Sequence, residues 1–240
     1  MRKLFYLLTD SRCLLCQKPL SFGAKYSNLL CNKCFKIFTP KKSEFFCPKC
    51  GEALKSDEIC SNCSVDVEII HYDSFRYIQS YSGAATQLVK LHKQHDNHKI
   101  LDLYSVFLSD ILNPDYPVYI VPDSLPGRIR KGKSCFSVQV AHKLRKKGFN
   151  VICGIIKKSP FAKMQKRLNR KDRHENAEKI FNLNKKISRV KTIFTCSETE
   201  TIQLIDDIFT TGSTINRFSK LLKDFGFKKV LAYSLFKAKY

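Results

Sequence analysis

The sequence is short of acidic side chains. Its 240 residues include 21 Asp and Glu against 43 Lys and Arg, which leaves a formal net charge of +22. A charge so far from zero predicts a polyanionic partner, either nucleic acid or an anionic membrane surface. The alternative is a basic enzyme from a lysine-rich proteome, in which the charge carries no information about partners.

The sequence also lacks a long apolar run near its start. Residues 1–8 have a basic head, but the apolar stretch Leu4–Leu8 is too short for a signal peptide or a membrane span. No secretion signal is therefore expected, and the chain is predicted to be cytoplasmic. A reducing compartment favours metal binding over disulfides for its cysteines.

Eight of the 11 cysteines lie within residues 13–63 as four Cys-x-x-Cys pairs. Such a pair places two thiolates on one metal, and two pairs complete a tetrahedral zinc site. Sequential pairing is preferred, because residues 47–51 followed by 60–63 resemble a zinc ribbon, although the spacing also permits crossed pairing. The predicted zinc ligands are Cys13, Cys16, Cys31 and Cys34 for one site, and Cys47, Cys50, Cys60 and Cys63 for the other.

These zinc sites are expected to be structural, since the module has no nearby His–Glu pair and is too short to fold on apolar burial alone. Residues 1–64 are predicted to form this module and residues 65–240 a second domain. His92, His95 and His98, with Asp96, are interpreted as a solvated helix end rather than another metal site.

Strand and helix patterns alternate through residues 65–240, which predicts an α/β fold with a parallel sheet. Strands are expected within 65–82 and near 117–122, 150–156, 179–183, 190–195, 202–206 and 229–236. Helices are expected over 83–95, 98–112 and 136–147 and from Ser213 to a stop at Gly226. Residues 157–178 have few apolar positions and are predicted to form a basic helix or flap.

Residues 202–214 carry the strongest chemical pattern. An apolar strand ends in Asp206 and Asp207, and Thr210, Thr211, Gly212, Ser213 and Thr214 follow before a helix. Hydroxyl groups, a glycine and a helix N-terminus suit a phosphate group. Adjacent carboxylates would repel phosphate but can accept hydrogen bonds from sugar hydroxyls. The pattern predicts a phosphorylated sugar as ligand; the alternative is a capped helix with solvated acids.

This segment resembles the thirteen-residue signature of the type I phosphoribosyltransferases. The resemblance implies a sheet of that kind and a site for phosphoribosyl pyrophosphate (PRPP) with Mg²⁺. Asp206 and Asp207 would hold its 2′ and 3′ hydroxyls, and residues 210–214 its 5′-phosphate.

Four Cys-x-x-Cys pairs before such a domain resemble the ComF family of competence proteins. A Leu-Lys pattern at residues 91–93 and a Gln165, Leu168, Arg173, Asn176, Phe181 pattern extend the likeness. The resemblance also implies that Lys93, Asp123 and Ser124 belong to the predicted PRPP site. The family implies a role in natural transformation, in which single-stranded DNA crosses the inner membrane from its cytoplasmic side.

The sequence departs from the family where the pyrophosphate loop is expected. The family has Pro-Val-Pro-Leu there and then Arg-Gly-Phe-Asn-Gln; this chain has Pro-Asp-Ser-Leu at 122–125 and Lys-Ser-Cys-Phe-Ser at 133–137. The departure leaves the 5′-phosphate and ribose pattern intact, so it bears more on catalysis than on binding. Asp123 could serve Mg²⁺ through water.

Two basic stretches are the candidates for contact with DNA, and Phe136 and Phe161 between them could stack on unpaired bases. The predicted DNA-binding residues are Arg128, Arg130, Lys131, Lys133, Lys163, Lys166, Arg167, Arg170, Lys171 and Arg173.

Three hypotheses follow from these patterns. The first, which we favour, is a competence protein that binds single-stranded DNA and PRPP during DNA uptake. The second is an active phosphoribosyltransferase, although no base-recognition motif identifies its acceptor. The third is a zinc-dependent adaptor that contacts the inner face of the inner membrane and docks a helicase or a membrane DNA channel.

Overall fold

The structure is a computed structural model of the whole chain. It describes residues 12–20, 29–39, 43–65, 69–95, 98–122, 136–158, 181–184 and 200–238. Among these residues, no helix is both long enough and apolar enough to cross a membrane.

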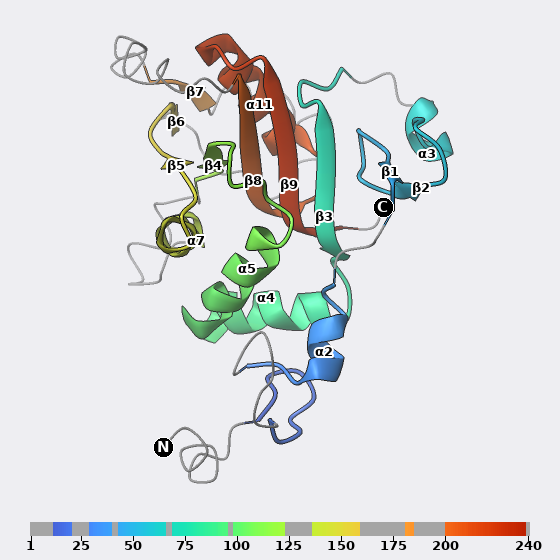
Figure 1. Cartoon of the computed structure of the whole chain (residues 1–240), viewed down its shortest axis with the longest axis vertical. Coiled ribbons are helices and arrows are strands. Elements are labelled where there is room, and N and C mark those ends of the chain that lie inside the picture. Colours follow the sequence, from blue (N-terminus) through green and yellow to red (C-terminus); the bar gives the residue numbers. More distant parts are fainter. Residues whose placement is uncertain are drawn as a thin grey trace.

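Five parallel strands form the central sheet, in the order β3-β9-β8-β4-β5 (Figure 1). The strands are β3 (Ser74–Ser80), β4 (Val118–Ile120), β5 (Val151–Ile152), β8 (Thr201–Phe209) and β9 (Lys229–Lys237). Strand β8 is the middle strand, between β9 and β4. The predicted parallel α/β fold is confirmed.

Helices cover both faces of this sheet. One face packs on α4 (Ala84–His95), α5 (His98–Ser109) and α7 (Phe136–Lys146), and the other on α11 (Ser213–Phe225). Successive side chains of a strand point to opposite faces, so in β8 Ile205 enters the first core while Ile202 and Leu204 enter the second. The apolar run of β8 is therefore buried on both sides.

Strand β8 is longer than its sequence predicts, because it continues through both aspartates to Phe209. Hydrogen bonding to β9 extends as far as the pair Phe209 and Lys237, and this supplies partners beyond the expected end at residue 206. The helix then starts at Ser213 and stops at Gly226, as predicted.

The region predicted as one strand over 150–156 is divided. After β5, strand β6 (Ile156–Lys158) leaves the main sheet and pairs antiparallel with β7 (Phe181–Leu183). The strand predicted near 190–195 lies outside the described residues.

The cysteine module contains α2 (Asn32–Lys36), α3 (Ser61–Ser64) and a small antiparallel pair, β1 (Phe45–Phe46) and β2 (Ala53–Leu54). Helix α2 lies near α4, whereas β1, β2 and α3 lie beside β3 (Figure 1). The predicted domain boundary after residue 64 stays a prediction.

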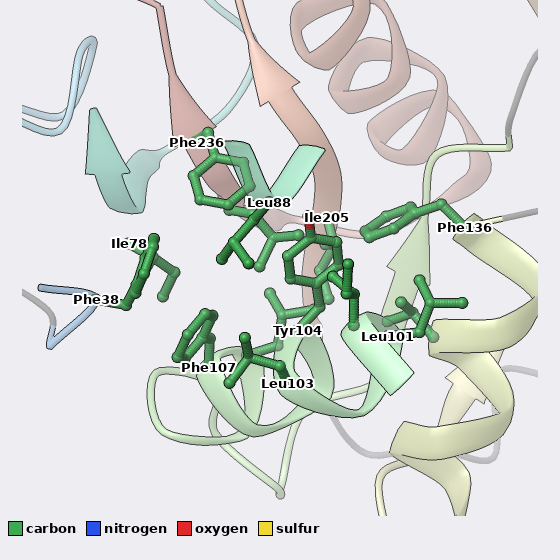
Figure 2. Packing of buried hydrophobic residues seen from close by; sticks show 14 of the residues in the cluster. Phe38, Ile78, Leu88, Leu101, Leu103, Tyr104, Phe107, Phe136, Ile205 and Phe236 are labelled. Carbon is green, nitrogen blue, oxygen red and sulfur yellow. The ribbon is translucent and has the colours of Figure 1, made fainter. Parts of the chain in front are cut away.

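The first half of the module shares a core with the sheet and its helices (Figure 2). Phe38 stacks on Phe107 of α5 with ring centroids 5.1 Å apart, and its edge meets Phe236 of β9. The Gln79 side chain also donates a hydrogen bond to the Ile37 carbonyl, at 2.6 Å. Burial of these rings anchors the segment that follows the first four cysteines.

His92 corrects one prediction. The sequence predicts a solvated histidine cluster, but the His92 side chain is buried in α4 and its ring makes a T-shaped contact with the Tyr104 ring. Packing of α4 against α5 covers it. The side chains of His95 and His98, and all of Asp96, lie outside the described residues.

Candidate functional site

The candidate site is built at the carboxyl end of β8, the edge at which parallel sheets hold their ligands. Asp206 and Asp207 occupy the last part of the strand and are half-buried. Each carboxylate accepts a hydrogen bond from the next backbone amide, Asp207 N to Asp206 Oδ1 at 2.9 Å and Ile208 N to Asp207 Oδ1 at 2.8 Å. An ionised carboxylate accepts several hydrogen bonds, and sugar hydroxyls are donors of the kind that it takes.

The regular alternation of side chains breaks at these two aspartates. Ile205 and Ile208 both pack in the core beneath α4 and α5, whereas Leu204 and Phe209 both pack in the core beneath α11. Strict alternation would put Ile205 and Ile208 on opposite faces. The change in facing therefore falls between Ile205 and Ile208, at the two aspartates.

Thr210, Thr211 and Gly212 form a short loop between β8 and α11. The hydroxyl groups of Thr211 and Ser213 are hydrogen bonded to each other, with their oxygens 2.7 Å apart. The Asn216 amide donates to the Gly212 carbonyl, at 2.8 Å, and this is the first hydrogen bond of the helix. The Ser213 amide makes a long hydrogen bond to Thr211 Oγ1, at 3.5 Å. The next amides, of Thr214 and Ile215, also precede the first helical hydrogen bond and lie at the open end of the helix. Together with the hydroxyls of Thr210 and Thr214, they can receive an anion.

Gly212 is required by this loop geometry. Its φ is +77°, a left-handed conformation, and a Cβ there would lie 2.8 Å from the Phe209 ring. Side chains other than glycine rarely adopt this φ. The loop thus turns tightly over the Phe209 ring, and this ring restricts the conformation that the loop can adopt.

Sequence reasoning missed Asn216, which lies one turn into α11. Its side chain accepts from the His71 amide, at 2.6 Å, and donates to the Ile69 carbonyl, at 2.9 Å. It therefore ties the segment that leads from the cysteine module into β3 to the helix of the candidate phosphate site. The sequence around Asn216 contains no pattern from which its hydrogen bonds to residues 69–71 could be predicted.

Gln203 lies fully buried in β8. Its side chain bonds the amide and carbonyl of Asn113 and the carbonyl of Tyr116, at 2.8, 2.8 and 3.1 Å. The strand that carries the two aspartates is thereby fixed to the loop that precedes β4.

Tyr104 lies on α5, close enough to Asp207 for the two side chains to interact electrostatically. It is buried among aromatic rings, and its hydroxyl points toward Ile205 of β8 (Figure 2). Burial, the charge of Asp207 and then Tyr81 raise the pKa of Tyr104, so the phenol stays protonated. Among the described residues, no group hydrogen bonds to its hydroxyl.

The structure brings together the main part of the predicted PRPP site: Asp206, Asp207, Thr210, Thr211, Gly212, Ser213 and Thr214. Lys93 lies on α4, but its side chain is outside the described residues, as are Asp123 and Ser124. All ten predicted DNA-binding residues are also outside them, as is Phe161. Phe136 is buried against Tyr104 rather than exposed, so its predicted stacking on DNA bases is wrong.

The eight cysteines of the module form two clusters of four, grouped sequentially as preferred from the sequence. They are Cys13, Cys16, Cys31 and Cys34 in the first cluster, and Cys47, Cys50, Cys60 and Cys63 in the second. Within each cluster the sulfur atoms all lie within 4.8 Å of one another. Four sulfur donors at this separation match a tetrahedral zinc site.

The ionisation of the thiols also fits a cation in each cluster. Burial opposes ionisation of Cys13 and Cys47, but backbone amides donate to their sulfurs and lower the pKa of each to about 7. Burial and the neighbouring thiols raise the pKa of Cys34 and Cys63. One thiolate forms readily in each cluster, whereas Cys34 and Cys63 need a positive charge nearby to ionise, which Zn²⁺ would supply.

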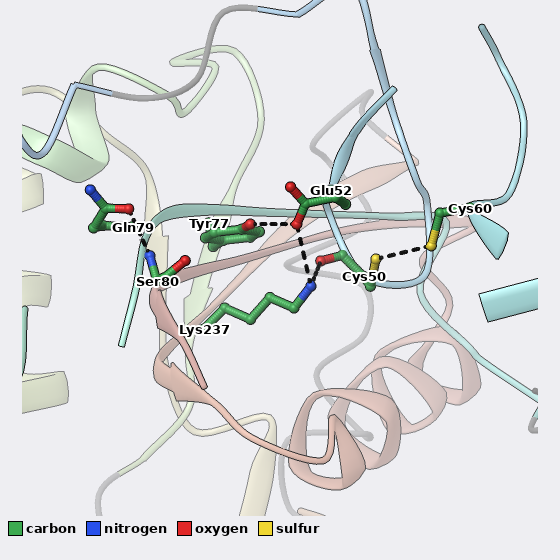
Figure 3. A network of polar contacts seen from close by, with 7 residues as sticks. All are labelled: Cys50, Glu52, Cys60, Tyr77, Gln79, Ser80 and Lys237. Carbon is green, nitrogen blue, oxygen red and sulfur yellow. Dashed lines mark hydrogen bonds and ion pairs between the residues drawn. The ribbon is translucent and has the colours of Figure 1, made fainter. Parts of the chain in front are cut away.

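The second cluster is fastened to the edge of the sheet (Figure 3). The hydroxyls of Tyr72 and Tyr77 donate to the Lys49 carbonyl and to Glu52 Oε2, at 2.8 and 2.9 Å. Lys237 Nζ donates to the Cys50 carbonyl, at 2.8 Å. Strands β3 and β9 therefore hold the turn from Cys47 to Gly51, which is the first zinc knuckle of this cluster.

Comparison with known proteins agrees with these features. A family model described as the double zinc ribbon domain matches residues 4–64. Competence protein ComFC of Streptococcus pneumoniae is 26% identical in an alignment of 238 positions that covers 93% of this chain and 99% of that protein. Competence protein F of Haemophilus influenzae is 32% identical over 84 residues, 35% of this chain and 34% of that protein.

The resemblance predicted from the sequence is thus confirmed: the chain begins with a double zinc ribbon and is similar along nearly its whole length to a competence protein named ComFC.

Proposed function

We propose that this protein acts in competence for natural transformation, and that it binds a phosphoribosyl ligand, PRPP with Mg²⁺, together with single-stranded DNA. The similarity to two competence proteins supports the cellular role. The ligand proposal stands on the site itself.

One arrangement carries the ligand proposal: adjacent carboxylates at the end of the middle strand, followed within a few residues by a hydroxyl-lined turn and a helix N-terminus. The amides and hydroxyls at residues 210–214 suit a phosphate group, whereas Asp206 and Asp207 would repel one. A ligand that satisfies both parts has an anionic group at one end and vicinal hydroxyls at the other. A 5-phosphorylated ribose has this form.

The DNA proposal rests on charge. The chain has a formal net charge of +22, and the two basic stretches at residues 128–133 and 163–173 contain ten of its 43 Lys and Arg residues. Lysine and arginine that neutralise DNA phosphates release counterions, so binding should weaken steeply with salt. Affinity that does not change with salt would refute this part of the proposal.

Ligand binding is tested by titration calorimetry of the zinc-loaded protein with PRPP and Mg²⁺, ribose 5-phosphate and pyrophosphate. Asp206→Asn and Asp207→Asn should each weaken PRPP binding roughly 10- to 100-fold, because each removes charge-assisted hydrogen bonds of about 1.5–3 kcal/mol. Asp224→Asn, on the exposed side of α11, is the matched control and should bind as the unaltered protein does.

The comparison of ligands adds a second criterion. Ribose 5-phosphate should retain binding that depends on both aspartates, whereas pyrophosphate should be insensitive to them. Equal loss for both ligands would mean that the aspartates act through the fold and not through the sugar hydroxyls.

Turnover is assayed in the same samples by pyrophosphate release, with free bases or a single-stranded oligonucleotide as acceptors. Release that is lost in Asp206→Asn and Asp207→Asn would establish an active transferase. Binding without release would leave a PRPP-responsive DNA-binding protein. A salt series with the oligonucleotide, with and without PRPP, measures whether the two ligands influence each other.

A further inference from the structure

Two aromatic rings lie between the second cysteine cluster and the candidate phosphate loop. Phe75 of β3 and Phe209 of β8 are both buried, and their ring centroids are 4.1 Å apart. A Cβ on Gly51, next to Cys50, would lie 2.9 Å from the Phe75 carbonyl and 3.1 Å from its ring. On the other side, a Cβ on Gly212 would lie 2.8 Å from the Phe209 ring. The knuckle, the two rings and the loop therefore touch in sequence.

Lys237 makes a second connection between the same two places. Its amine donates to the Cys50 carbonyl, at 2.8 Å, and its backbone is the register partner of Phe209. The next amide, Ala238 N, donates to the Phe209 carbonyl, at 2.8 Å. Phe209, which supports the phosphate loop, is thus connected to the knuckle in two ways: its ring contacts Phe75, and its backbone pairs with that of Lys237.

The contacts of the first cluster, among the described residues, follow a different route. Phe38, which follows this cluster in the chain, contacts Phe107 of α5 and Phe236 of β9 rather than Phe75 or Phe209. Among the described residues, no hydrogen bond or ring contact joins its cysteines to residues 209–213. The two zinc sites therefore differ in position relative to the ligand site, which makes one a control for the other.

We propose that Phe75 and Phe209 are positioning residues that couple the second cysteine cluster to the phosphate loop, so that zinc at Cys47, Cys50, Cys60 and Cys63 strengthens binding of the phosphorylated ligand. A close-packed interior transmits small shifts because no void absorbs them. Without zinc the four thiols lose their common centre, and Gly51 no longer holds Phe75 against Phe209. The Gly212 turn then loses the surface that defines it.

Coupling of this kind is reciprocal. If zinc at the second cluster raises the affinity for PRPP by some factor, PRPP must raise the affinity of that cluster for zinc by the same factor. This inference rests on the proposed ligand, and its test separates the two claims.

The test removes one ligand from each cluster in the full chain. Cys63→Ala opens the second cluster, and Cys16→Ala opens the first. We expect Cys63→Ala to raise the Kd for PRPP with Mg²⁺ by a factor of about 5–150, the usual range for coupled sites. Cys16→Ala should change it less than about twofold, since among the described residues no hydrogen bond or ring contact joins its cluster to the loop. Equal effects of the two substitutions would overturn the proposal.

Hydrogen–deuterium exchange gives a readout that needs no ligand. Chelation of zinc should speed amide exchange in residues 209–214 of the unaltered protein and of Cys16→Ala, whereas in Cys63→Ala the exchange is already fast. If unaltered protein binds no PRPP, the proposed function fails, yet this exchange experiment still decides the coupling. Unchanged exchange at residues 209–214 on zinc removal would refute it.

Substitutions outside the clusters identify the connecting residues. Lys237→Met removes the bond to Cys50 but keeps all eight cysteines, and Lys237→Arg retains a donor. The ratio of PRPP Kd values without and with zinc should shrink in Lys237→Met and in Phe75→Leu and should recover in Lys237→Arg. A merely structural role would weaken binding with and without zinc equally and leave this ratio unchanged, which would exclude both residues as the connection.

Discussion

The strongest test of the loop geometry is the substitution Gly212→Ala. It adds one methyl group at a position whose φ is +77°, and that methyl would lie 2.8 Å from one atom of the Phe209 ring and 3.1 Å from another. Two separate costs follow, one from the backbone conformation and one from the collision.

The magnitude of each cost can be assigned. A residue other than glycine in a sparsely populated conformation costs about 1–3 kcal/mol. Forcing an extra methyl group into a packed site costs about 1–3 kcal/mol more, because Phe209 is buried against Phe75 and has little room to retreat. The total loss in the free energy of unfolding is about 2–6 kcal/mol, the sum of these two.

Gly148→Ala separates the two costs. Gly148 also has a left-handed conformation, with φ of +92°, but a Cβ there meets nothing within 4 Å. It should show the conformational cost alone. We expect Gly212→Ala to be less stable than Gly148→Ala by about 1–3 kcal/mol, measured by urea unfolding of the zinc-loaded proteins.

Ligand binding provides the second measurement on this pair. Gly212→Ala should weaken PRPP binding more than about tenfold, which is about 1.4 kcal/mol, because the turn that aims the helix amides is displaced. Gly148→Ala should bind normally. Equal destabilisation of the two variants, together with unaltered binding by Gly212→Ala, would refute the account of Phe209 as the surface that shapes the loop.

Three further predictions concern the supports of the site. Gln203→Leu should lower the free energy of unfolding by about 2–4 kcal/mol, because the buried Gln203 side chain no longer bonds the backbone groups of Asn113 and Tyr116; Gln79→Leu, a half-buried position whose side chain bonds the Ile37 carbonyl and the Ser80 amide, should cost less. Asn216→Ala should cost about 1–3 kcal/mol for two lost hydrogen bonds and should speed amide exchange at His71, where an unchanged rate would contradict the bond. Zinc binding to metal-free protein should release more protons at pH 6 than at pH 8, since Cys13 and Cys47, with pKa values of about 7, are mostly protonated at pH 6 and mostly ionised at pH 8. Calorimetry in buffers of different ionisation enthalpy measures this release, and equal proton counts at the two pH values would contradict it.

Features that depend on neighbours in the chain could be predicted from the sequence. The spacing of the cysteines defines the knuckles, because both thiolates of a pair come from one short turn. The Asp206–Thr214 pattern locates a strand, a turn and a helix start, since apolar periodicity and Gly212 act locally. Gly226 ends α11 for the same reason, with φ of +133°.

Features that depend on which elements meet could not. His92 and Phe136 look suited to solvent or to DNA, but packing of α4, α5 and α7 buries both. Strand β8 continues past Asp206 only because β9 offers it hydrogen-bond partners.

By itself, then, the sequence determined the parallel α/β fold, the two cysteine clusters and the carboxylate and hydroxyl groups of the candidate site, because short-range stereochemistry specifies them. The tertiary structure alone decided what surrounds those groups. Gly51 and Gly212 are far apart in the chain. In the fold, Phe75 packs against Gly51, Phe209 packs against Gly212, and the two rings contact each other. Such a contact exists only after the sheet has formed, since strand pairing is what brings β3, β9 and β8 together.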